Sequence, residues 1–71
     1  MKIQVSITSK LVALEKEVRE KRNNLLALTD WTQLSDSKVN RETWAIYRQQ
    51  LRDISLQENF PFNVVWPIKP S

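Results

Sequence analysis

The sequence predicts an all-α protein in which a long N-terminal helix and a short second helix form a hairpin. Apolar residues recur at helical spacing in two stretches, and a run of turn-forming residues lies between them. Pro61, Pro67 and Pro70 exclude a further helix near the C-terminus. The chain of 71 residues has room for one small domain, and a domain of that size buries only about 60% of its unfolded surface.

The first helix is expected over residues 9–28, with Thr8 or Ser9 as its N-cap. Its apolar residues follow a heptad seam with alternating spacings of four and three, interrupted by Lys21. The members of this seam are Ile7, Leu11, Leu14, Val18, Leu25 and Leu28. A narrow seam flanked by charges is typical of a coiled coil. It also fits an amphipathic helix that packs inside its own chain, and both interpretations stay open.

The segment before residue 9 is ambiguous. Ile3, Val5 and Ile7 alternate with polar residues, which fits a short strand. The alternative is a lead-in to the helix, because a lone strand has no obvious partner here. Neither a signal peptide nor a run of about 20 apolar residues is visible, so no membrane association is expected.

A second helix is expected from about Arg41 to Ile54, with Asn40 as its N-cap, after a polar connection over residues 29–37. Trp31 and Leu34 are the apolar anchors of that connection. The apolar face of the second helix consists of Trp44, Tyr47, Leu51 and Ile54. We expect a small core built mainly from four aromatic side chains, which are Trp31, Trp44, Tyr47 and Trp66.

The proline-bracketed stretch FPFNVVWP, residues 60–67, is expected to form an extended tail that packs back across the hairpin. In a fully extended segment, alternate side chains share a face. The predicted inward set is Phe60, Phe62, Val64 and Trp66. Val65 would then face outward.

The composition argues against catalysis. The chain has no histidine, cysteine or glycine, so the usual general base, thiol nucleophile and phosphate-binding loop are absent. Asp30, Asp36 and Asp53 lie where helix capping explains them. No cofactor, metal or disulfide is expected, which leaves oligomerisation or docking on a partner as the means to stabilise so small a chain.

The alternative function is that of a small nucleic-acid-binding or regulatory helical protein. Arg41, Arg48 and Arg52 form a strip beside Trp44 and Tyr47, and cations next to stacking rings are typical of single-strand binders. In the competing interpretation the rings belong to the core and the arginines flank it, with their stems packed. The net charge of +3 comes from interleaved acids and bases rather than from a basic stripe, which favours the core interpretation.

Three blocks of the sequence resemble the phage tail assembly chaperone family. They are RNNLLALTDWTQLSD (22–36), WAIYRQQLRDIS (44–55) and FPFNVVWP (60–67), in the order and spacing of the family. By this resemblance the signature residues are Trp31, Trp44, Tyr47, Arg48, Leu51, Arg52, Phe60, Pro61, Trp66 and Pro67.

The resemblance implies a non-enzymatic phage tail protein that binds a tail-fibre or baseplate polypeptide. It would act in the bacterial host cytoplasm during assembly, or remain as a small structural component of the virion tail. Residues 22–71 would be the chaperone-like hairpin with its tail, and residues 1–21 would begin the long helix and provide oligomerisation. Contacts with other copies or with a partner helix are then expected at Ile7, Leu11, Leu14, Val18 and Leu25.

Overall fold

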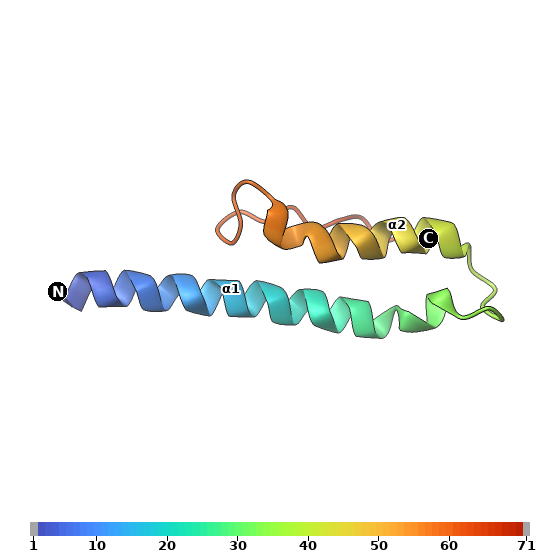
Figure 1. Ribbon diagram of the computed structural model, residues 1–71, viewed down its shortest axis with the longest axis horizontal. Coiled ribbons are helices and arrows are strands. Elements are labelled where there is room, and N and C mark those ends of the chain that lie inside the picture. The colour runs from blue at the N-terminus through green and yellow to red at the C-terminus, as the bar shows by residue number, and fades with distance from the viewer. Residues whose placement is uncertain (1, 71) are drawn as a thin grey trace.

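The two predicted helices lie antiparallel, joined by a short connection (Figure 1). The computed structural model describes the backbone of residues 2–70 and the side chains of residues 9–70. All regular structure within residues 2–70 is helical, so the predicted all-α hairpin is confirmed. The elements in chain order are α1 (Lys2–Leu28), the 3-10 helix η1 (Asp30–Gln33), α2 (Arg41–Arg52) and the 3-10 helix η2 (Asp53–Leu56).

Helix α1 begins earlier than predicted. Residues 2–8 are helical, so the strand alternative is wrong, and Thr8 and Ser9 lie inside the helix rather than at its N-cap. Extending an existing helix adds one hydrogen bond per residue without a new nucleus, whereas a short strand would have had no partner. The side chain of Ile7 lies outside the described residues.

Helix α2 begins where the sequence predicts. The side chain of Asn40 caps it, because Asn40 Oδ1 accepts a hydrogen bond from the backbone N–H of Thr43 at 3.1 Å. The α-helix ends at Arg52 rather than at the predicted Ile54, and the chain tightens into η2. Ile54 nevertheless stays in the core, with 1% of its surface exposed.

The core lies between the two helices. Its buried apolar members, all from α2 and η2, are Trp44, Tyr47, Leu51 and Ile54. Trp44 and Tyr47 pack edge to face with ring centroids 5.8 Å apart. Of the four aromatic residues predicted for the core, only Trp44 and Tyr47 are buried in it. Trp31 is 51% exposed and lies at the edge of the core, with its ring centroid 6.4 Å from that of Trp44. Trp66 is partly buried and packs against the outside of the core.

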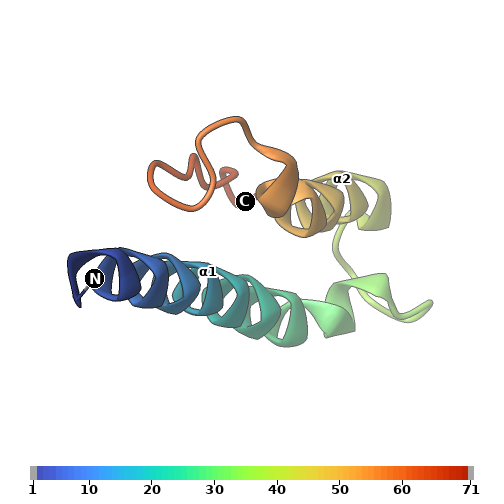
Figure 2. The same cartoon turned by 60° about the vertical axis from the view of Figure 1, so that its left-hand side comes forward.

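The C-terminal tail, a name used from here on for residues 60–70, folds back along the hairpin, as predicted (Figures 1 and 2). Residues 58–63 form turns, which include a cis Phe60–Pro61 peptide bond, and residues 64–70 continue without helix or strand. The predicted alternation is wrong for Phe62, which is exposed because the turns reorient it. Val65 faces outward, as predicted.

The molecule is elongated, with principal extents of 56 × 19 × 15 Å. The 27 residues of α1 span about 40 Å, which is more than the length of α2 and the folded tail. The N-terminal part of α1 therefore projects beyond the rest of the chain (Figure 1), and Val18 is the first described residue of α1 that packs against the core. We call residues 2–14 the shaft and residues 15–70 the head.

Candidate protein-interaction site

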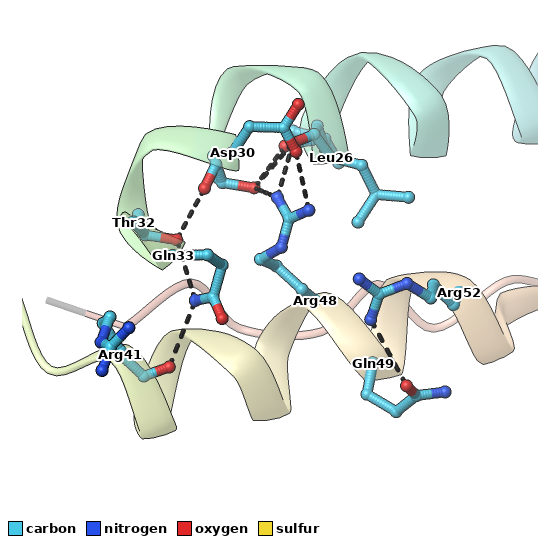
Figure 3. Close-up of polar contacts among 10 residues, drawn as sticks. Leu26, Asp30, Thr32, Gln33, Arg41, Arg48, Gln49 and Arg52 are labelled. Carbon is cyan, nitrogen blue, oxygen red and sulfur yellow. Dashed lines mark hydrogen bonds and ion pairs between the residues drawn. The ribbon is translucent and has the colours of Figure 1, made fainter. Parts of the chain in front are cut away.

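Arg48 joins the two helices of the head. From the buried face of α2 its guanidinium reaches the C-terminal end of α1 (Figure 3). There Nη1 donates to the carbonyl of Leu26 at 2.6 Å and to Thr29 Oγ1 at 2.9 Å. Its Nη2 donates to the carboxylate of Asp30 at 2.7 Å. Because the last carbonyls of a helix have no partner within the helix, a cation placed here satisfies them and favours the helix dipole.

Two threonines complete this junction. The Thr29 hydroxyl donates back to the carbonyl of Leu25 at 2.8 Å, and the buried Thr32 hydroxyl donates to the carbonyl of Thr29 at 2.6 Å. Gln33 extends the network to α2 by donating to the carbonyl of Arg41 at 3.2 Å (Figure 3). Arg48 and the polar residues at the hairpin turn therefore have a structural role, which is to fix one helix against the other.

This arrangement breaks up the proposed nucleic-acid strip. Arg48 is 8% exposed and is engaged by α1, whereas Arg41 and Arg52 are exposed. Trp44 and Tyr47 are buried, so their faces are not available for stacking on bases. The three arginines therefore do not form a strip on the surface, and among the described side chains no pair of exposed rings lies beside them. The nucleic-acid alternative finds no support.

The heptad seam of α1 is divided between two environments. Val18 and Leu25 pack against the core of the head, so two of the five predicted contact residues serve the fold of their own chain. Lys21, which interrupts the seam, lies under the tail with its Nζ 4.3 Å from the centre of the Trp66 ring. Leu28, the last member, is exposed.

On the shaft, the seam continues without the head over it. Leu11 and Leu14 precede Val18 at the heptad spacing, so they lie on the same face of α1 that the head covers further along. Both are partly exposed, and Val12 on another face is exposed. The five predicted contact residues therefore do not form one continuous open surface.

The tail is attached to the rest of the head by three kinds of contact. The guanidinium of Arg19 lies 5.5 Å from the centre of the Phe60 ring, next to the pair formed by Lys21 and Trp66. The side-chain amide of Gln57 donates to the carbonyl of Val65 at 2.7 Å and accepts from its N–H at 2.9 Å. The apolar contacts come from the partly buried Phe60, Val64 and Trp66.

Sequence reasoning missed the contributions of Arg19, Lys21 and Gln57 to this attachment. The sequence contains one signal for Lys21. A lysine in an otherwise apolar seam indicates that a group packed against it accepts its charge. An aromatic ring accepts a cation on its face, and the aromatic-rich tail supplied the candidates. Nothing comparable in the sequence singles out Gln57.

The described residues offer no metal site, since no three acidic side chains come together. Within residues 2–70, no helix has the length and apolar character needed to cross a membrane. The geometry is that of a folded, elongated head with an exposed helical extension.

Comparison with known proteins agrees with this geometry. The family model described as phage tail assembly chaperone protein matches residues 15–71. No curated protein and no solved structure matches the chain. The matched range contains every signature residue, and residues 2–14 lie before it. The family match connects the protein with phage tail assembly and with tail proteins as its partners. The chain belongs to the phage tail assembly chaperone family.

Proposed function

We propose that this protein is a non-enzymatic assembly factor that binds a tail-fibre or baseplate polypeptide in the host cytoplasm while the tail is being built. The observation that supports this proposal is the shaft, which carries the apolar seam of α1 beyond the head. A helical extension that carries an apolar seam is suited to packing against another helix.

A partner would add to the stability of the shaft. As the continuation of α1 the shaft needs no nucleus of its own, but most helical stability in proteins comes from packing of an apolar face. Complete burial of a leucine side chain contributes about 1.5–3 kcal/mol. Leu11 and Leu14 are already partly buried, so each would contribute less than this on docking.

The partner of the shaft is either a helix of a tail polypeptide or the shaft of a second copy. Within the head, Val18 and Leu25 are engaged by the core, so the open part of the seam is limited to Leu11, Leu14 and, from the sequence, Ile7. Two heptads are short for a coiled coil of this chain with itself. We therefore favour a helix of a tail polypeptide, with self-association through the shafts as the second form of the same proposal.

Sedimentation with purified tail-fibre and baseplate polypeptides tests the shaft. The wild-type chain is expected to co-sediment with one of them, and Leu14→Glu is expected to abolish the complex by placing a charge in the seam. Val12→Glu is the matched control, because Val12 is exposed on another face, and it is expected to bind normally. A wild-type chain that sediments as a monomer with every tail polypeptide would contradict the proposal.

Mass spectrometry of purified virions separates the two roles that the family allows. An assembly factor leaves before the particle is complete, so its peptides are expected to be missing from mature virions and present in infected-cell extracts. Detection of the chain in virions at a fixed ratio to the tail proteins would instead identify a permanent structural component.

A further inference from the structure

Three large apolar side chains of the tail point into solvent at regular intervals. Phe62, Val65 and Ile68 are 74%, 71% and 91% exposed, and each is three residues after the one before. We call these three residues the outer ridge. Single exposed apolar residues are ordinary on protein surfaces, but a regular row of three on one short segment is a feature that the fold itself does not require.

The other two rows of the same segment are used by the head. One row packs toward α2 and the core, and its members are Pro61, Val64, Pro67 and Pro70, all buried or partly buried. The other row faces α1 through Phe60 and Trp66, which lie against Arg19 and Lys21, whereas its remaining members, Asn63 and Lys69, are exposed. Among the described residues of the tail, the outer ridge is therefore the row whose apolar members are all exposed.

The outer ridge is held in place before any partner arrives. Gln57 binds both backbone groups of Val65, the central residue of the ridge. Pro61 and Pro67, on either side, fix their own φ angles and are buried or partly buried. A segment restrained in this way loses little conformational entropy on docking, which favours affinity.

The surroundings of the tail are positively charged. Lys21 lies against Trp66, Lys38 lines a cavity of about 600 Å³ together with Pro70, and Lys69 is on the tail itself. None of these three lysines takes part in an ion pair among the described side chains. Two acidic residues also lie here: Glu58 precedes the tail, and Asp53 lines a cavity together with Val65 and Pro67. Because the three lysines outnumber these two carboxylates, a complementary surface would carry carboxylates on balance.

We infer that the outer ridge is a second docking surface, which fits an apolar groove bordered by carboxylates on the tail polypeptide that the protein assists. The inference rests on the proposed function, because it takes the partner to be a phage tail protein. The proposed contact differs from that of the shaft, because it is made by the C-terminal tail of this chain. The ridge supplies the apolar contact, and Lys21, Lys38 and Lys69 supply charge around it.

The test compares two triple variants that remove similar exposed apolar surface. The ridge variant is Phe62→Ser, Val65→Ser and Ile68→Ser. The control variant is Leu28→Ser, Leu34→Ser and Leu56→Ser, at three exposed leucines outside the tail. Binding to each purified tail-fibre and baseplate polypeptide of the same phage is measured by biolayer interferometry at low and high salt, and circular dichroism confirms that each variant is helical.

The ridge variant is expected to bind the partner at least about tenfold more weakly, and the control variant to bind like the wild type. High salt is expected to weaken wild-type binding, and Lys69→Glu to weaken it mainly at low salt. If the ridge variant is not helical, Ile68→Ser alone replaces it, since Ile68 is the most exposed of the three. A weaker but still measurable loss is then expected.

Three results would overturn the inference. Unchanged affinity of the ridge variant, together with binding lost in Leu14→Glu, would leave the proposed function standing and remove the ridge from it. Loss of self-association by the ridge variant, with tail-polypeptide binding intact, would show that the ridge contacts a second copy instead. If no tail polypeptide binds the wild-type chain, the proposed function fails and the ridge proposal fails with it.

Discussion

Leu25 and Leu11 belong to one seam of one helix, but they have different surroundings. Leu25, in the head, packs against the buried face of α2, whereas Leu11, in the shaft, is not among the residues that contact the core. The two positions have the same residue type and the same heptad phase. The periodicity of a helix therefore identifies its apolar face, but not what covers that face.

The most damaging change to the head is expected at Leu51, which has no exposed surface. Leu51→Ala leaves a cavity between the helices and is expected to cost about 2–5 kcal/mol. A chain of 71 residues has roughly 4–11 kcal/mol of stability in total. Thermal unfolding followed by circular dichroism is expected to show a fall in Tm of roughly 10 °C or more.

This variant also tests whether the shaft depends on the head. If it does, the helical signal of the shaft disappears in the same transition, because a short isolated helix is marginal. A residual helical signal above the main transition would show that the shaft is stable alone or in a self-associated form, and would weaken the distinction between the two regions.

The junction at Arg48 is expected to be nearly as sensitive. Arg48→Lys keeps the charge but cannot reach Leu26, Thr29 and Asp30 together. The buried acceptors left unpaired are expected to cost about 2–3 kcal/mol, measured by urea unfolding. Asp30→Asn is the control. The Asp30 side chain is 69% exposed, so this change is expected to cost less than about 1 kcal/mol. Equal losses for both variants would show that the ion pair, rather than the capping of α1, stabilises the hairpin.

Most of the fold was predictable from local patterns. The apolar face of α2, its N-cap at Asn40 and the turn-forming connection are short-range signals, and the structure confirms all three. The Arg48 junction was not predictable in the same way. Its partners are 18 to 22 residues away in sequence, and on a helical wheel Arg48 resembles the exposed Arg41 and Arg52. Which arginine turns inward depends on where α1 ends, which is a tertiary property.

The candidate site was less predictable than the fold. The tail was expected to alternate like a strand, but Phe62 is exposed and Pro61 and Pro67 are buried or partly buried, because turns and prolines set its backbone. Trp31 was expected in the core, but η1 carries it to the edge. Composition identified the residues of the tail as apolar, and only the packing on α1 and α2 decided which of them face outward.

Trp66→Ala tests how far the tail belongs to the head. Trp66 is partly buried against the core and stacked under Lys21, so its loss is expected to cost about 2 kcal/mol. Ile68→Ala, on the exposed side of the same segment, is expected to be within about 0.5 kcal/mol of the wild type. Chemical denaturation of both variants measures the difference. Unchanged stability of Trp66→Ala would show that the tail is an appendage.

A smaller effect is expected at the start of α2. Asn40→Ala removes the acceptor for the Thr43 N–H and is expected to cost about 1 kcal/mol. Asn40→Asp, which keeps the acceptor, is expected to restore most of this stability. Thermal unfolding compares the two, and a loss of the same size in Asn40→Asp would mean that the amide group, rather than capping, is what matters at this position.

The smallest effect is expected in the shaft, where it tests the comparison directly. Leu11→Ala is expected to change the unfolding free energy of the isolated chain by less than about 0.5 kcal/mol. Leu25→Ala, the same change in the same seam, is expected to cost about 1–2 kcal/mol, because the side chain packs against the core while remaining partly exposed. For the affinity of a tail polypeptide the order is expected to be the opposite. Leu11→Ala is then expected to have the larger effect, since the partner would cover Leu11. Equal costs at the two positions in the isolated chain would mean that the shaft is already packed, and that no surface is left there for a partner.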